Sequence, residues 1–191
     1  MFRLMRNTHL ILGLVFFFFA FIFAVSSLRI IYRPWLPNDR EDQKQTIQID
    51  PANAASPRAL AVDLMRHHGL IGELRDIKES DGLMKFLIMR PGTYARVEYV
   101  PGSSEVTINT QRWGWQETFV QLHTNHGFHH EYLPSSAWAL LSLLGSIALL
   151  LMGATGIYLW FCLHEERVIG SILLVVGLVY GLTSLIWARM V

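Results

Sequence analysis

The sequence predicts an α+β membrane protein, with three transmembrane helices and a small extracytoplasmic domain built from one helix and an antiparallel sheet. Two observations predict this class. More than half of the 191 residues are hydrophobic (52%), and they gather in three blocks that contain no charged side chain. The polar stretch between the first two blocks has one helical pattern followed by several alternating, strand-like runs.

The three hydrophobic blocks are expected to cross a membrane as helices. They cover Leu10–Leu28, Ser136–Phe161 and Val168–Trp187. A helix that crosses the hydrocarbon layer needs about 20 apolar residues, and in lipid its backbone groups must be satisfied within the segment. The first block is longer and bulkier than the core of a cleavable signal peptide, so we expect it to be retained as a span.

Arginines beside the spans predict the orientation. Arg3 and Arg6 precede the first span, and Arg167 lies in the short turn between the second and third. Short cytoplasmic loops are enriched in Lys and Arg, so we expect a multi-pass protein of the bacterial inner membrane with a cytoplasmic N-terminus. Residues 34–135 are then periplasmic. The arginines at the end of the first span favour the opposite orientation. Since no basic face is present, nucleic acid is not an expected partner.

These patterns divide the chain into six segments. We expect an N-terminal segment with the first span (1–33), a connector (34–55), an α+β domain (56–114), an amphipathic interfacial helix with a histidine-rich hinge (115–135), the second span (136–163), and a cytoplasmic turn with the third span (164–191). In the α+β domain, Ser56 suits a helix N-cap and Gly69 a helix stop. Three or four strands are expected to follow this helix, because the alternating runs end in Pro-Gly turns.

The sequence also predicts where several side chains of the expected helix and of the membrane segments lie. His68 shares the apolar face of the helix and is expected to be partly buried, whereas Asp63 can reach His67 one turn away. Tryptophans near the spans are expected to anchor the chain at the membrane interface: these are Trp113, Trp115, Trp138 and Trp160.

Glycines on the second and third spans are expected to form a packing surface. Small residues allow helices to approach closely in lipid, where van der Waals contact holds helices together. The glycines concerned are Gly145, Gly153 and Gly156 on the second span and Gly170, Gly177 and Gly181 on the third. The simplest outcome is a hairpin of these two spans, and the alternative is docking on a larger membrane complex.

Three short motifs make the chain resemble the PepSY-associated transmembrane family. His9 and Gly13 match the His-x-x-x-Gly start of its first span, and Leu122 and His123 match its Leu-His element before the second. The run Gly-Ile-x-Leu-Trp that ends at Trp160 matches its span ending. The resemblance implies a PepSY-like α+β domain outside the membrane. The family includes longer inner-membrane proteins, among them ferric-siderophore reductases that carry haem between histidines.

Histidines at the span ends are candidate ligands. On the expected orientation, one group lies at each membrane face, as a transmembrane haem pathway would need. The candidates for haem b are His9, His123, His126 and His164. His126 and His130, four residues apart, are candidate metal ligands on one helical face. The alternative is that these histidines are interfacial polar caps that hold no ligand.

The sequence contains no nucleophile elbow, phosphate-binding loop or zinc-protease motif. We therefore expect a non-enzymatic accessory or scaffold protein without a cofactor, surrounded by membrane lipid. Its sheet edge and its Trp-rich helix are expected to bind a protein or peptide, such as another membrane protein or a second copy of the chain. The alternative is a haem- or metal-linked redox component in ferric-siderophore metabolism, as a haem-dependent oxidoreductase or part of one.

Overall fold

The computed structural model describes residues 1–190 except 33–38, 81, 125, 126, 129, 164 and 166. The chain divides into two compact units. The first contains Met1–Phe18 and Leu144–Val191, and the second contains Phe19–Leu143. Both units contain parts of the long apolar helices, and the second also contains the sheet.

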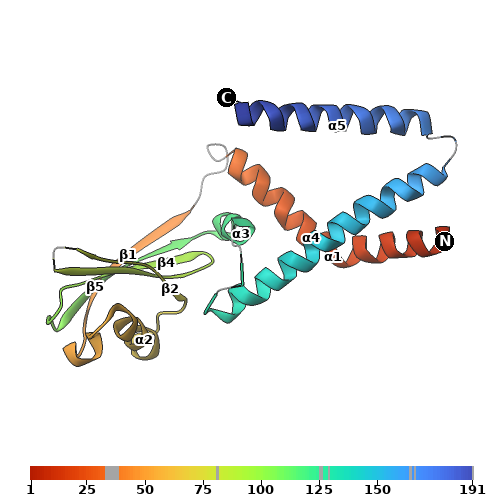
Figure 1. Ribbon diagram of the computed structural model, residues 1–191. Helices are drawn as coiled ribbons and strands as arrows, with labels where there is room; N and C mark the ends of the chain where they lie inside the picture. The colour runs from red at the N-terminus through yellow and green to blue at the C-terminus, as the bar shows by residue number, and fades with distance from the viewer. Residues whose placement is uncertain are drawn as a thin grey trace. The chain divides into compact units, whose positions relative to one another are not determined.

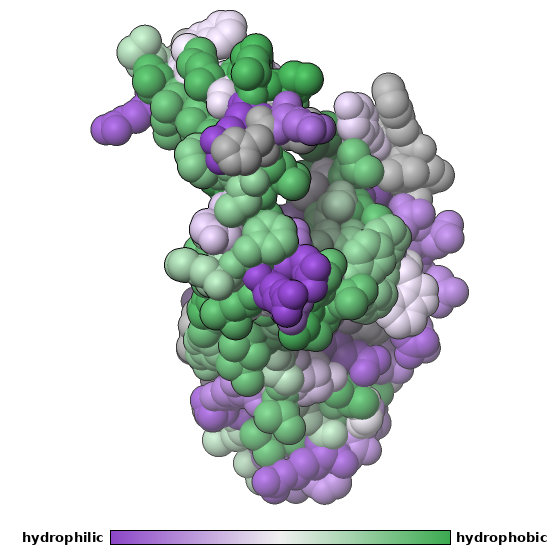
Figure 2. All heavy atoms as spheres, turned by 90° about the vertical axis from the view of Figure 1, so that its right-hand side faces the viewer, coloured by the Kyte–Doolittle hydropathy of each residue, from purple (hydrophilic) through white to green (hydrophobic). Residues whose placement is uncertain are grey.

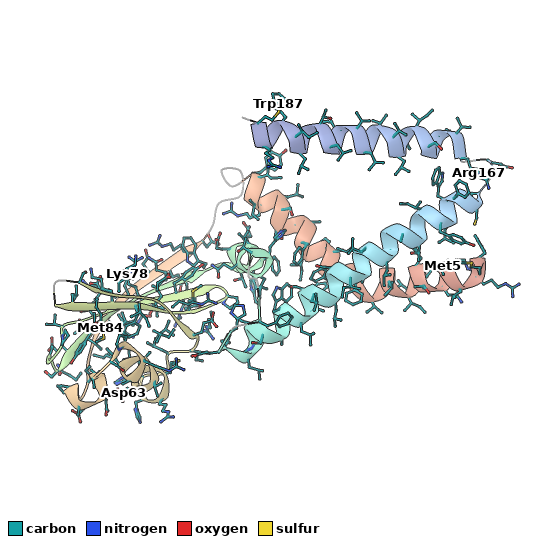
Figure 3. The ribbon with its side chains drawn as sticks, viewed as in Figure 1. Met5, Asp63, Lys78, Met84, Arg167 and Trp187 are labelled. Atoms are coloured by element: carbon teal, nitrogen blue, oxygen red, sulfur yellow. The ribbon has the colours of Figure 1, made fainter. Side chains whose placement is uncertain are left out.

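Three long helices match the expected spans. They are α1 (Phe2–Ile31), α4 (Leu133–Cys162) and α5 (Arg167–Met190). All three are long and apolar enough to cross a membrane, which confirms the prediction of a membrane protein with three such helices. Hydrophobic side chains cover α5, the uppermost helix in Figure 2. At its start, Arg167 (Figure 3) donates from Nε to the carbonyl oxygen of Phe161, 2.8 Å away, and so satisfies a carbonyl at the end of α4.

The packing of the glycines differs from the expected hairpin of α4 and α5. No residue of α5 is buried, and a Cβ placed on Gly177 or Gly181 would meet no described atom within 4 Å. At Gly170, a Cβ would overlap the indole ring of Trp160. On α4, a Cβ at Gly156 would lie 3.3 Å from Cε1 of His9. The small-residue side of α4 therefore faces α1 at this point.

A five-stranded antiparallel sheet forms the centre of the second unit. Its strands are β1 (Arg40–Gln48), β2 (Glu73–Ser80), β3 (Leu83–Arg90), β4 (Thr93–Tyr99) and β5 (Glu105–Trp113). Their order is β1-β5-β4-β3-β2, so that β1 and β2 are the edges. The last four strands correspond to the expected runs, and neighbours in the sequence pair with one another in the sheet. The fold is α+β, as predicted.

Helix α2 (Pro57–His67) covers one face of the sheet (Figure 1). The side chain of Ser56 accepts a hydrogen bond from the backbone N–H of Ala59, and Gly69 has φ +72°, so the predicted start and stop are confirmed. Leu60 and Leu64 pack into the core. Their partners come from alternate positions of the strands: Phe86, Ile88, Val97, Tyr99, Val106 and Ile108.

Strand β1 lies inside the segment 34–55, which the sequence presents as a connector. A short 3-10 helix, η2 (Pro51–Ala54), follows the strand. Most side chains of β1 are exposed, so the strand does not need apolar residues at alternate positions. Its sequence therefore lacks the alternation of apolar and polar residues by which a strand is usually recognised. Instead, the strand is held by backbone pairing with β5, in a register that runs from Arg40 opposite Trp113 to Gln48 opposite Glu105.

Two expectations about side chains have opposite outcomes. The prediction that His68 is partly buried is wrong: His68 is exposed, as the C-cap residue just after α2 ends at His67. The predicted contact between His67 and Asp63 is confirmed, with Nδ1 3.0 Å from Oδ1. Asp63 (Figure 3) also accepts a hydrogen bond from Asn53 Nδ2 at 3.0 Å, which joins α2 to η2.

Candidate functional site

His9 lies against α4 within the first unit. Its Nδ1 is 3.2 Å from the carbonyl oxygen of Met152 and 3.0 Å from the hydroxyl of Thr155. The Thr155 hydroxyl donates to the carbonyl oxygen of Leu151 at 2.7 Å. Since a carbonyl oxygen accepts only, Nδ1 of His9 carries the proton and donates it. The glycine at 156 leaves the space that the imidazole ring occupies.

His123 lies near the end of helix α3 (Trp115–Thr124), in the second unit. Its Nδ1 is 2.7 Å from the hydroxyl of Ser26 on α1, and that hydroxyl donates to the carbonyl oxygen of Phe23 at 2.9 Å. Ser26 is fully buried, and the Phe23 ring lies 4.4 Å from the imidazole, centroid to centroid. The Ser26 hydroxyl is within hydrogen-bond distance of both the Phe23 carbonyl oxygen and Nδ1 of His123, so this contact fixes the position of the imidazole ring.

Both family-motif histidines are held in the same way. In each, Nδ1 lies within hydrogen-bond distance of an oxygen of a neighbouring helix, which leaves Nε2 for another partner. A metal-binding histidine is commonly oriented by such a bond on its other ring nitrogen. His9 and His123 thus fit the donor requirement of an axial haem ligand, each within its own unit.

Of the other candidate ligands, only His130 is among the described residues. His126 and His164 lie outside the described residues. Helix α3 ends at Thr124, so His130 is not on it, and the expected pairing of His130 with His126 falls outside the described residues. Among the described residues, no group of three or more His, Cys, Asp or Glu side chains could hold a metal ion.

His130 belongs instead to a buried ionic cluster with Glu73 and Arg75 of β2. The imidazole is 1% exposed and the Glu73 side chain 8% exposed. His130 Nδ1 is 3.0 Å from Oε1 of Glu73, and Arg75 donates to the same oxygen from Nε at 2.8 Å. Burial alone would raise the pKa of Glu73, but the hydrogen bonds from His130 and Arg75 outweigh it and hold that pKa below its usual value.

Three of the four expected interface tryptophans line one cavity of about 650 Å³ in the second unit, here called the aromatic cavity. It lies between the β3–β4 turn, the junction of β5 with α3, and the first turns of α4. Its lining residues are Arg90, Pro91, Gly92, Thr93, Trp113, Gly114, Trp115, Thr118, Leu122, Tyr132, Pro134 and Trp138. The sequence indicated the tryptophans one by one, but no motif indicated that they meet. Trp160 lies elsewhere, against Gly170.

These features define a multi-pass α+β membrane protein with paired helix–histidine contacts. The family model for the PepSY-associated TM region matches residues 2–162. The chain therefore belongs to the PepSY-associated transmembrane family. No curated protein and no solved structure gives a significant match to this chain.

Proposed function

We propose that this protein is an accessory or scaffold subunit of the bacterial inner membrane, whose sheet domain binds a protein or peptide partner. The proposed orientation places the N-terminus in the cytoplasm and residues 34–135 in the periplasm. Arg3, Arg6 and the turn at Arg167 support this orientation through the charge bias of short cytoplasmic loops. Family membership supports the placement in a membrane.

The observation that carries the proposal is the sheet face opposite α2. On the α2 side, alternate strand residues are almost fully buried. On the other side, Leu87, Arg96 and Asn109 are half-buried or exposed, and Lys85 pairs with Glu98 at 3.3 Å. A small two-layer domain that leaves a broad mixed face open has a surface suited to a protein partner.

The sheet edges are less suited to a partner than this face. Strand β1 presents charged side chains in its first half, at Arg40, Glu41, Asp42 and Lys44, and β2 has an irregular register between Arg75 and Lys78, where Asp76 has φ +50°. Charges and bulges at an edge oppose the addition of another strand. Trp115, 77% exposed at the start of α3, remains a second contact candidate, as the Trp-rich helix was expected to be.

Photo-cross-linking of the full chain in its native membrane tests the proposal. A photoreactive amino acid is placed at Arg96 on the open face, and a control at Arg66, which is exposed on α2. We expect a discrete cross-linked product from position 96 and none from position 66. Equal products from positions 96 and 66, or no product from position 96, would contradict the proposal. The mass of the product distinguishes a second copy of the chain from another protein.

A second candidate function, a haem-linked redox component, is favoured by the shared arrangement of His9 and His123, whose Nδ1 atoms both contact an oxygen of a neighbouring helix. Their Nε2 atoms are the groups that would hold a haem, and a bound haem would supply one-electron transfer. Met152, Thr155 and Ser26 would keep the two imidazoles oriented, through the hydrogen bonds described above.

An absorption spectrum and an iron analysis of gently solubilised protein test this second function. A Soret band that is lost or shifted in His9→Ala or His123→Ala, but kept in His67→Ala, would support it. His67 is the matched control because its imidazole is largely exposed and contacts Asp63. A colourless, iron-free preparation would leave the scaffold function as the better description.

A further inference from the structure

Hydrogen bonds connect the walls of the aromatic cavity to one another. The backbone N–H of Gly92 donates to Oε1 of Gln121 at 2.6 Å, and the N–H of Trp113 donates to the carbonyl oxygen of Gly92 at 2.9 Å. Trp138 Nε1 donates to the carbonyl oxygen of Leu122 at 2.8 Å. These three bonds join the β3–β4 turn, α3 and the start of α4, so the shape of the cavity is built into the fold.

The lining of the aromatic cavity is apolar, with a positive charge. Arg90 is the one charged residue among the lining residues, and no carboxylate is among them. Its side chain is half-buried and has no hydrogen bond or ion pair with another described residue. The indole N–H of Trp113 is buried and also has no acceptor among the described residues. A half-buried guanidinium and a buried donor both favour an anionic guest.

The position of the aromatic cavity, at the start of α4, indicates the class of ligand that it would bind. Pro134 and Trp138 belong to the first turns of α4, a helix long and apolar enough to span the membrane. A cavity at the start of a span lies at the level of the lipid headgroups, where Trp and Tyr side chains are enriched. An amphiphile that combines a phosphate with an acyl chain is present there at high concentration.

We propose that the aromatic cavity binds one anionic phospholipid of the surrounding membrane. The phosphate pairs with Arg90, and the glycerol and the upper part of an acyl chain lie against Trp115 and Trp138. The cavity volume is within the range of small-molecule sites. It therefore holds the headgroup region, while the rest of the chains stay in the bilayer. Such a lipid would hold the β3–β4 turn and α3 at the membrane surface.

Native mass spectrometry of the full chain tests this site. The protein is reconstituted with equal amounts of phosphatidylglycerol and phosphatidylcholine and then released into mild detergent. We expect one tightly retained phosphatidylglycerol per chain. Arg90→Gln removes the charge at the rim and should lower retention about tenfold or more, as expected for loss of a charge-assisted contact. Arg96→Gln, on an exposed residue outside the cavity, should retain the lipid like the unmodified protein.

A second variant keeps the test valid if Arg90→Gln does not fold. Trp115 is 77% exposed, so Trp115→Ala removes part of the cavity wall without removing a buried core residue, and it should also lower retention. Equal retention of both lipids, or equal retention by Arg90→Gln and Arg96→Gln, would overturn the proposal. Displacement of the lipid by inorganic phosphate alone would overturn it as well, because the site would then recognise a free anion. Binding of an acidic peptide in preference to the lipid would have the same consequence.

Discussion

His130 Nδ1 lies 3.0 Å from Oε1 of Glu73, in a contact that joins an edge strand of the sheet to the residues just before α4. Arg75 completes the cluster by donating to the same carboxylate. On the same segment, the hydroxyl of Ser136 donates to the carbonyl oxygen of His130 at 3.0 Å. The contact with the buried carboxylate of Glu73 thus fixes the segment that leads into α4. Most other ion pairs between described residues are exposed.

The ionic cluster predicts a specific loss of stability at low pH. The pKa of Glu73 is held below its ordinary value of 4.5, so the cluster contributes its full stability above that pH. As the pH falls below the ordinary value and through the lowered pKa, the carboxylate is protonated and the contribution is lost. Glu73→Gln should destabilise the domain by about 3 kcal/mol at neutral pH, as for a broken buried pair. Thermal unfolding of the full chain in detergent measures both effects.

The matched control for this prediction is the pair Arg58–Glu131, with atoms 2.8 Å apart but side chains 71% and 61% exposed. Glu131→Gln should change stability by less than about 1 kcal/mol, as is usual for surface pairs. The stability difference between the unmodified protein and Glu73→Gln should shrink as the pH is lowered below 4.5, the ordinary pKa of the carboxyl, and through the lowered pKa of Glu73. A difference that stays constant with pH would show that the carboxylate acts through packing alone.

The β3–β4 turn gives a second prediction, because it requires glycine for two reasons. Gly92 has φ +82°, and a Cβ there would lie 2.6 Å from Oγ1 of Thr118. Gly92→Ala combines backbone strain with a steric overlap and should destabilise the domain by about 3 kcal/mol. Gly82→Ala isolates the first cause, because Gly82 has φ +70° and no described atom within 4 Å of the Cβ position. It should cost about 1 kcal/mol.

Adding Thr118→Ala to Gly92→Ala should recover the part of the loss that comes from the overlap. The double variant should then resemble Gly82→Ala in unfolding temperature. Equal destabilisation by Gly82→Ala and Gly92→Ala would show that Thr118 of α3 does not pack tightly against Gly92. The shape of the aromatic cavity would then not depend on this contact.

Much of the fold could be predicted because it follows from local patterns. The spans show as long uncharged runs, and α2 shows as an N-cap at Ser56 with a stop at Gly69. Strand β1 could not be predicted in this way, because an exposed edge strand needs no apolar side chains and is held by its backbone. The packing of α5 was expected from Gly177 and Gly181, but small residues show only where a helix can approach, not whether it does.

The candidate site was predictable in its residues but not in its geometry. His9 and His123 match family motifs, yet their partners Thr155 and Ser26 are far away in the sequence and form no motif with them. The aromatic cavity combines three segments that only the sheet topology brings together. His130 appeared as a metal candidate in a histidine-rich run, whereas its partner Glu73 lies 57 residues earlier.

The contact of His9 with α4 gives a third prediction. A Cβ at Gly156 would lie 3.3 Å from Cε1 of His9, so Gly156→Ala should weaken the packing of α1 on α4 and lower the unfolding temperature in detergent. Gly153, one turn earlier on the same helix, has no described atom within 4 Å of its Cβ position. Gly153→Ala should therefore leave stability unchanged or raise it by up to about 1 kcal/mol, the helix preference of Ala over Gly.

A double-mutant cycle separates this contact from a general effect of the substitution. His9→Ala removes both the ring and its hydrogen bonds to Met152 and Thr155. In that background, Gly156→Ala no longer meets an imidazole and should behave like Gly153→Ala, with a coupling free energy of about 1 kcal/mol between positions 9 and 156. Additive effects of His9→Ala and Gly156→Ala would show that the imidazole does not rest on α4 at Gly156, and the tautomer assigned to His9 would then lose its structural basis.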